Sequence, residues 1–161
     1  MPRVLQGDIF ATARAHESEL TIVFGSMGFN HMKLYWPMFA VTVASLSHIR
    51  DPFSDVLPQP YEYTPGRWLW FIRERENHGM TESDVRYALD AAFSWARQNG
   101  LKTVITNGIA DTVDHSDIAA KQKSNDRRAR LLIGLASDCE RRFGLDITLV
   151  SLGTVFTRNV P

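Results

Sequence analysis

The sequence predicts one α/β domain that spans residues 1–161 and is built on a largely parallel β-sheet. Residues 67–152 alternate between short apolar runs and longer amphipathic segments, in the order strand, helix, strand, helix, strand. Such alternation is typical of parallel sheets with crossover helices. The 161 residues are 44% hydrophobic and 22% charged, a composition that favours one globular core over a disordered chain.

The first part of the chain predicts two strands. Arg3–Phe10 is predicted as a strand that runs into a turn at Gly7-Asp8, and a short polar helix is expected over Ala11–Glu19. Leu20–Phe24 is a compact, β-branched run that is apolar on both faces, as a central strand is. The glycines of Gly25-Ser26-Met27-Gly28 stop this second strand.

The middle of the chain is less regular. Met38–Leu46 follows a proline and is compatible with either a strand or a helix. Asp51–Gly66 carries four prolines and predicts a long surface excursion. A loop of that length is often functional, as a lid or a partner contact, and the alternative is an ornament without function.

The first strand–helix pair of the second half begins at Arg67–Glu76, a run with two tryptophans that predicts a strand. Thr81 with Asp84 resembles a capping box, and the helix that it starts ends at Asn99-Gly100. Its inward positions follow helical spacing: Val85, Ala88, Leu89, Ala92, Trp95 and Ala96.

The rest of the chain repeats this pattern. We expect a buried strand over Leu101–Ile109, a polar loop over Ala110–Asn125, an amphipathic helix over Asp126–Phe143 and a final strand over Asp146–Leu152.

Composition and charge limit the partners. The 18 basic and 18 acidic residues cancel, so the net charge gives no reason to expect nucleic acid, although a local patch stays compatible with it. The longest apolar stretch, Trp36–Leu46, is too short to span a bilayer, and the first residues lack a leader pattern. We therefore expect a cytoplasmic protein. The single cysteine, Cys139, lies on the inward face of the last helix and is expected to be a small core residue.

Three segments are expected at one edge of the sheet, because parallel strands release their following loops on the same side. They are Gly25–Gly28, Arg75–Gly79 and Asn107–Asp117. The glycines of the first segment allow backbone amides to approach a phosphate. No complete dinucleotide pattern and no Walker lysine follows, so we expect no cofactor.

The third of these segments is the most polar. Asp111, Asp114, His115 and Asp117 lie within seven residues, and carboxylates beside an imidazole can hold a hard divalent metal or act as general acid and base. Asp111, Asp114 and His115 are the candidate catalytic residues. The alternative is that the aspartates only serve turns, and no metal site is expected.

A basic run follows this loop and consists of Lys121, Lys123, Arg127, Arg128 and Arg130. It falls at the predicted start of the last helix, where the helix dipole disfavours positive charge. The run is therefore either a solvated face or a place where an anion or another chain binds.

The order of these elements resembles that of macro domains over most of the chain. Val4-Leu5-Gln6-Gly7-Asp8-Ile9 is similar to the first strand of that family, where a Gly-Asp-Ile stretch ends the strand and its Asp contacts the adenine of ADP-ribose. The resemblance implies a three-layer α/β/α sandwich with a mixed, largely parallel sheet and a nucleotide-type ligand at the strand ends. It implies these ligand-binding residues: Asp8, Ile9, Gly25, Ser26, Gly28, Asn107 and Gly108.

The chain departs from the family pattern where the phosphates would lie. Gly25–Asn30 keeps two glycines and one asparagine, and Asn107–Asp111 keeps a single glycine. Side chains in such a loop obstruct the close approach of backbone amides to a diphosphate. The resemblance therefore predicts the fold more directly than it predicts the ligand.

Three functions remain open. The chain either binds a nucleotide or ADP-ribose-type ligand, with or without hydrolysing it, or is a hydrolase that uses the Asp111–Asp117 loop on another small substrate. The third possibility is an interaction module or homo-oligomer in which Trp36, Trp68, Trp70 and the proline-rich segment present an apolar patch.

Overall fold

A computed structural model of the chain describes residues 1–25, 60–73, 82–107 and 118–161. The elements in these ranges are β1 (Arg3–Gln6), α1 (Ile9–Ala15), β2 (Leu20–Gly25), β3 (Tyr61–Thr64), β4 (Arg67–Arg73), α4 (Glu82–Gln98), β5 (Thr103–Asn107), α5 (Ile118–Phe143), β6 (Asp146–Ser151) and the 3₁₀ turn η2 (Thr157–Asn159).

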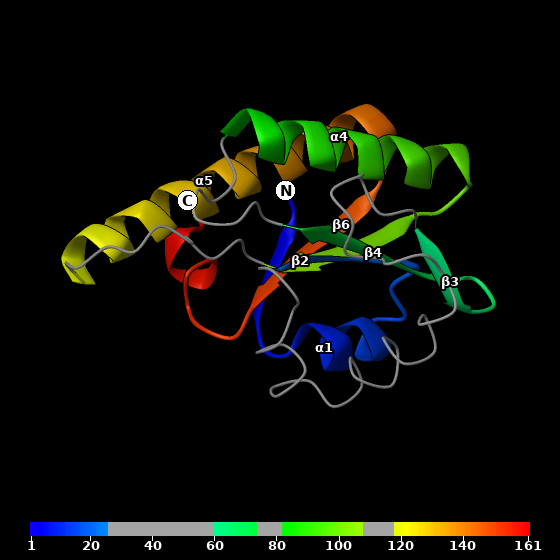
Figure 1. Ribbon diagram of the computed structural model, residues 1–161, viewed down its shortest axis with the longest axis horizontal. Coiled ribbons are helices and arrows are strands. Elements are labelled where there is room, and N and C mark those ends of the chain that lie inside the picture. The colour runs from blue at the N-terminus through cyan, green and yellow to red at the C-terminus, as the bar shows by residue number, and fades with distance from the viewer. Residues whose placement is uncertain (26–59, 74–81, 108–117) are drawn as a thin grey trace.

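The strands form one six-stranded sheet in the order β1-β6-β5-β2-β4-β3. Every neighbouring pair is parallel except β3 and β4, which are antiparallel at one edge. Helices α4 and α5 cover one face of the sheet and α1 lies on the other (Figure 1). The predicted three-layer α/β/α sandwich with a mixed, largely parallel sheet is therefore confirmed.

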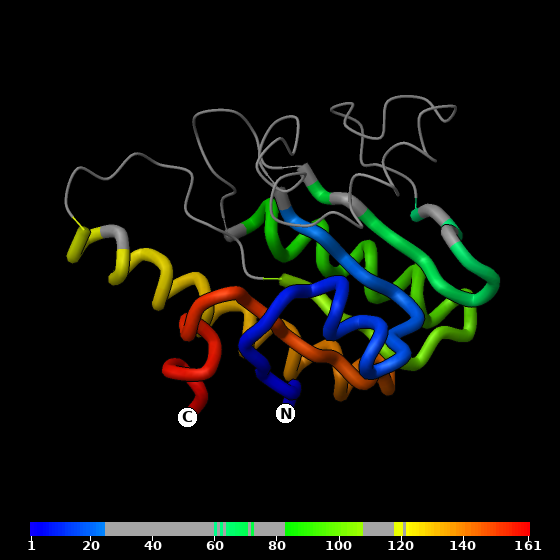
Figure 2. The backbone as a smooth tube through the Cα atoms, turned by 90° about the horizontal axis from the view of Figure 1, so that it is seen from below, coloured from blue at the N-terminus to red at the C-terminus, as the bar shows by residue number. Residues whose placement is uncertain are grey.

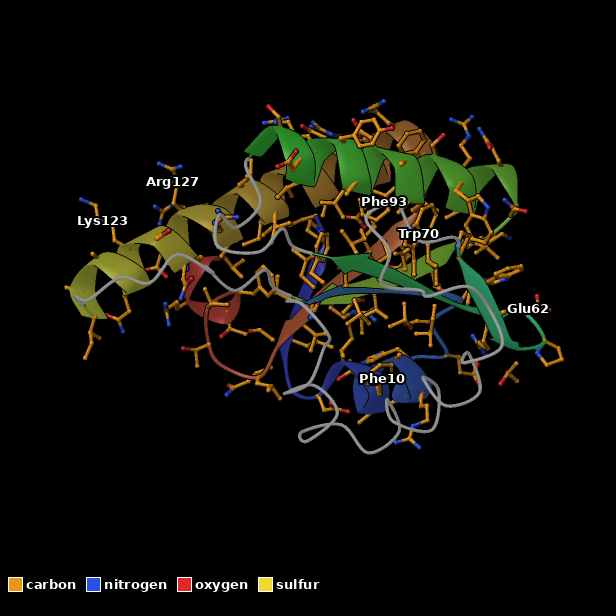
Figure 3. All side chains as sticks on the ribbon, viewed as in Figure 1. Phe10, Glu62, Trp70, Phe93, Lys123 and Arg127 are labelled. Carbon is orange, nitrogen blue, oxygen red and sulfur yellow. The ribbon has the colours of Figure 1, made fainter. Side chains whose placement is uncertain are left out.

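The main core lies between the sheet and the two long helices. Leu20, Ile22 and Phe24 point from β2 toward this side, and Phe93 of α4 meets them there. Figure 3 shows Trp70 and Phe93 in this layer and Phe10 pointing toward the sheet from the opposite side. The α1 side has a thinner apolar layer, made of Ile9, Phe10, Ala13, Val23, Leu69, Ile105 and Val150.

The first strand is shorter than predicted, because Ile9 and Phe10 begin a helix. The amide of Gly7 donates a hydrogen bond to the carbonyl of Ser151 at 2.8 Å, which is the last ladder bond of β1. Asp8 then caps α1, since its Oδ2 accepts a hydrogen bond from the amide of Ala11 at 2.8 Å. An N-terminal Asp cap ends the strand earlier than the apolar pattern indicates.

The segment Asp51–Gly66 was expected to be a surface excursion throughout, and that prediction is wrong at its end. Tyr61–Thr64 forms β3, which pairs with β4 through a turn at Pro65-Gly66. Gly66 has a φ of +77°, and a proline followed by a glycine with positive φ suits a tight turn. Residues 51–59 of that segment and Met38–Leu46 lie outside the described residues.

The last helix begins eight residues before the predicted start at Asp126. Residues 118–125 were expected to belong to a polar loop, yet they form the first two turns of α5. Alanine, lysine and glutamine in this stretch are good helix formers whatever their polarity. The expected conflict with the helix dipole does not arise for Arg127 and Arg128, because the dipole acts within the first turn and both residues lie beyond it. Lys121 is the fourth residue of the helix and does lie in that turn.

The chain ends in a short tail that was not predicted. Phe156 is fully buried in the main core and anchors the tail. Figure 2 shows that both termini lie on the same side of the molecule. Among the helices that the structure describes, none is both long and apolar enough to cross a bilayer.

Candidate functional site

The carboxyl ends of five strands lie along one edge of the sheet, which we call the carboxyl edge. The parallel registers set Gln6 beside Ser151, Val150 beside Asn107, and Gly25 beside Arg73. Asp8, Gly25 and Asn107, three of the residues proposed for ligand binding, therefore emerge on the same side of the molecule. The shared edge that the sequence predicts is present in the described part of the chain.

The neighbouring strands β5 and β2 are followed by connections that lead to opposite sides of the sheet. From β5 the chain goes on to β6, on the side of β1, whereas from β2 it goes on to β3 and β4 on the other side. Two adjacent parallel strands whose connections run in opposite directions leave room at their carboxyl ends, and ligands of open α/β sheets bind there. This switch point lies between Gly25 and Asn107.

Asn107 joins the two strands at this point. Its side-chain Oδ1 accepts a hydrogen bond from the amide of Phe24 at 2.8 Å, and its Nδ2 donates one to the carbonyl of Phe24 at 3.1 Å. The regular ladder between β2 and β5 ends one residue earlier, at the pair Ile22 and Thr106. The buried side-chain amide of Asn107 thus continues the pairing of β5 with β2 by one more residue. Both of its polar atoms are bonded to the backbone of β2.

Asp8 has one free oxygen. Its Oδ2 caps α1, while Oδ1 is buried and has no hydrogen-bond partner in the described part of the chain. A buried acceptor without a donor costs free energy and calls for an explanation, such as a donor on a ligand. The neighbouring Ile9 is 1% exposed, so its side chain belongs to the α1 layer and only its backbone remains for a ligand.

Sequence reasoning missed the neighbours of Asp8 after β6. Gln6 and Ser151 are the last register pair of β1 and β6, so Leu152 and Gly153 leave the sheet at the same end as Gly7 and Asp8. Gln6 Nε2 donates a hydrogen bond to the Leu152 carbonyl at 3.1 Å. Leu152 is 56% exposed, an unusual exposure for a leucine that directly follows a buried strand. The sequence placed Leu152 inside the final strand, whereas β6 ends at Ser151 and Leu152 follows it at the carboxyl edge.

Several proposed site residues lie outside the described residues. They are Ser26, Gly28, Gly108, Asp111, Asp114 and His115. Residues 1–25, 60–73, 82–107 and 118–161 contain no group of three histidines, cysteines or acidic residues that could hold a metal ion.

Cys139 lies away from the carboxyl edge, in a groove of about 350 Å³ between α4 and α5. The side chain is 2% exposed. Burial, followed by the nearby Asp90 carboxylate, raises the pKa of its thiol to about 11. A thiol with such a pKa is a weak nucleophile near neutrality, in agreement with the prediction that Cys139 is a core residue.

Two of the three tryptophans proposed for an interaction patch pack inside the domain. Trp70 is 6% exposed, and Trp68 packs partly buried against the core. Both rings meet Trp95 of α4 edge to face, at centroid distances of 4.9 Å for Trp68 and 5.8 Å for Trp70. These rings hold α4 to β4, and Trp36 lies outside the described residues.

Comparisons with known proteins point to one fold. No protein-family model matches the sequence, and no curated protein is similar to it. The structure is similar to a macrodomain protein from Streptomyces coelicolor, with 16% identity over 95% of this chain and 100% of that chain and a TM-score of 0.54. It is also similar to the macrodomain of Thermus aquaticus DarG, with 9% identity over 94% of this chain and 98% of that chain and a TM-score of 0.55.

A third similar structure is a K354E mutant of tomato leucine aminopeptidase, at 14% identity and a TM-score of 0.52. The likeness covers 99% of this chain and 35% of that chain, so it concerns one part of a larger protein. At these identities the likeness shows the fold alone. The chain has a macro-domain-like fold, as its sequence resemblance predicts.

Proposed function

We propose that this chain binds a nucleotide of the ADP-ribose type at the carboxyl edge of its sheet. Macro domains, which the sequence resembles, take such a ligand at their strand ends. Two structural neighbours that match nearly their whole length are macrodomains. The observation that carries the proposal is the unpartnered, buried Oδ1 of Asp8 at this edge.

Asp8 would read the base. A carboxylate oxygen accepts hydrogen bonds, and the exocyclic amino group of adenine donates them. Oδ1 is held in place because Oδ2 of the same carboxylate caps α1 at 2.8 Å from the amide of Ala11. The exposed side chain of Leu152, which follows the last register pair of Gln6 and Ser151 at this edge, would pack against the flat face of the base.

The phosphates would lie toward the switch point between β2 and β5. Gly25 ends β2 there, and Ser26, Gly28 and Gly108 follow the two strands in sequence. Asn107 would act through the backbone, because its side chain is bonded to Phe24. By fixing the ends of both strands, it would set the direction in which the following amides leave the sheet.

Isothermal titration with ADP-ribose tests the proposal, with the inosine counterpart of the same ligand as the comparison. Hypoxanthine presents a carbonyl oxygen where adenine presents an amino group, and that oxygen would face the Asp8 carboxylate. We expect binding of ADP-ribose and at least tenfold weaker binding of the inosine ligand. A protein that shows no heat with millimolar ADP-ribose does not have this function.

Three substitutions at Asp8 separate base reading from helix capping. Asp8→Asn and Asp8→Ser keep a side-chain oxygen that can cap α1 but lose the second carboxylate oxygen. Asp8→Ala loses both roles. We expect all three to lose the preference for adenine, and only Asp8→Ala to lose about 1 kcal/mol of stability through the lost cap. Retention of the adenine preference in Asp8→Asn and Asp8→Ser would exclude Asp8 as the base reader.

Hydrolysis is the second part of the proposal. Asp111, Asp114 and His115 belong to the ten-residue connection that starts at the carboxyl edge after Asn107. These residues would supply general acid and base to a ligand held there. Chromatography of the ligand after incubation detects turnover, and the double variant Asp114→Asn/His115→Ala should retain binding and lose turnover. Equal turnover in the variant and the wild type would remove these residues from the mechanism.

A further inference from the structure

Zero net charge conceals an uneven distribution of charge along the chain. Residues 118–130, the first half of α5, hold five of the 18 basic residues and one of the 18 acidic residues. The rest of the chain is therefore net acidic. Although the charges of the whole molecule sum to zero, the electrostatic potential around this half of α5 is positive.

Three cations of this half-helix lie on one exposed face. Lys123, Arg127 and Arg130 are spaced by four and three residues, which places them on the same side of a helix. All three side chains are exposed. We call this set the basic ridge. Lys123 and Arg127 project outward from the end of α5 that extends beyond the sheet (Figure 3; the extension is also visible in Figure 2).

Asp126, the only acidic residue of this half-helix, forms its ion pair and hydrogen bonds with the tail rather than with Lys123 or Arg127. Asp126 Oδ1 is 2.8 Å from Arg158 Nη2 and also accepts a hydrogen bond from Asn159 Nδ2 at 2.8 Å. Arg130 Nη1 donates to the neutral Asn159 Oδ1 at 3.1 Å. After the hydrogen bonds from Asn159 and Arg158, the charge of Arg130 also helps to lower the pKa of Asp126, so Asp126 offsets part of the positive field at this one ridge residue. In the described part of the chain, Lys123 and Arg127 have no carboxylate within ion-pair distance.

We propose that the basic ridge binds the phosphate backbone of a nucleic acid. Lys123 and Arg130 are seven residues apart in α5, or roughly 10 Å at 1.5 Å per residue, which is about three steps of a duplex at 3.4 Å each. Two of the three cations are arginines, whose planar guanidinium groups bind phosphate oxygens in pairs. A helix that extends beyond its domain can approach a duplex without a clash from the sheet.

A membrane fits this surface less well. Helices that lie on anionic membranes use a basic face together with an apolar face that enters the lipid. Over most of α5 the apolar face is buried, since Ala129, Leu132 and Ile133 pack into the domain core. Among the large apolar side chains of α5 that the structure describes, only Ile118 is exposed, at 79%, which leaves little apolar surface to enter a lipid. None of the three ridge residues is among the residues named for the proposed function.

Fluorescence anisotropy with a labelled DNA duplex of about 20 base pairs tests the inference on the full chain. For about three phosphate contacts, affinity should fall roughly 40-fold between 50 and 200 mM salt, with a log–log slope of about −2.7. The variant Lys123→Glu/Arg127→Glu should bind at least tenfold more weakly at 50 mM salt, with a slope reduced by about two.

The matched control is Arg14→Glu/Lys102→Glu. It changes the net charge by the same amount at two exposed positions, one in α1 and one just before β5. We expect less than a twofold change in duplex affinity. Titration with ADP-ribose should give the same result for the ridge variant and the wild type, which keeps the two binding functions distinguishable.

Three outcomes would overturn the inference. One is no duplex binding by the wild type at 50 mM salt and about 100 μM protein. Another is an equal loss of affinity in the ridge variant and the control, which would assign any binding to net charge. The last is binding to vesicles of anionic lipid, lost in the ridge variant, with no binding to the duplex.

Discussion

The side-chain amide of Asn107 pairs with the backbone of Phe24 as a peptide group would. One atom of the amide accepts from the Phe24 N–H at 2.8 Å and the other donates to the Phe24 carbonyl at 3.1 Å. Strands β2 and β5 can thus separate beyond Ile22 and Thr106 without leaving either group of Phe24 unpaired. These two hydrogen bonds allow the strands to part at the switch point while the N–H and the carbonyl of Phe24 both keep a partner.

Asn107→Leu should destabilise the fold by roughly 2–4 kcal/mol, because it leaves a buried donor and a buried acceptor of Phe24 unpaired. Urea denaturation followed by circular dichroism measures the loss. Asn99→Leu is the control, since the Asn99 amide also bonds to a backbone carbonyl, that of Trp95, but in an exposed place. A loss in Asn107→Leu no larger than in Asn99→Leu would show that the amide bridge contributes nothing to stability.

Gly134→Ala should stabilise the protein by roughly 0.5–1 kcal/mol. Gly134 is an exposed residue inside α5, and an added Cβ would meet no atom within 4 Å. Alanine has the higher helix propensity. Gly144, just after the same helix, has equally open surroundings but a φ of +67°, so Gly144→Ala should cost about 1 kcal/mol. Thermal unfolding of both variants checks the opposite signs, and a shared sign would contradict the helix geometry.

The Cys139 thiol should be nearly inert in the folded protein. With a pKa raised from 9.0 to about 11, its thiolate fraction at pH 8 is about one in a thousand, roughly 100-fold below that of the unshifted thiol. Labelling with iodoacetamide at pH 8, followed by mass spectrometry, should be at least 100-fold slower in buffer than in concentrated urea. Comparable rates in the two solutions would mean that Cys139 is accessible.

The tail should contribute stability that depends on pH. Hydrogen bonds from Asn159 and Arg158 lower the pKa of Asp126 below its ordinary value of 3.8. A carboxyl whose pKa is lower in the folded state stabilises that state above its unfolded pKa, and the contribution is lost as the pH falls through the folded value. Asp126→Asn should therefore lower the urea midpoint at pH 7 and have a smaller effect near pH 3. An effect that grows on acidification would reverse this assignment.

Local patterns in the sequence identified most of the sheet. Leu20–Phe24 and Asp146–Leu152 are apolar on both faces because central strands are buried on both sides, and the structure contains both strands, the latter ending at Ser151. The helix that ends before Asn99-Gly100 was also recognised from its spacing and its stop signal. The predicted boundaries were wrong at two helix starts. Asp8 starts a helix inside an apolar run, and helix-forming polar residues before Asp126 resemble a loop.

The candidate site divides in the same way. The sequence by itself placed Gly25 and Asn107 at strand ends that share one edge, because the order of strands and helices implies parallel pairing. The resemblance to macro domains placed Asp8 at the end of the first strand. Only the tertiary structure decided which atoms remain available there. The amide of Asn107 is bonded to Phe24, Oδ1 of Asp8 is left without a donor, and the register of β1 with β6 brings Gln6 and Ser151 to the same edge. Strand order, register and burial depend on contacts between residues far apart in the chain, and local composition carries no information about them.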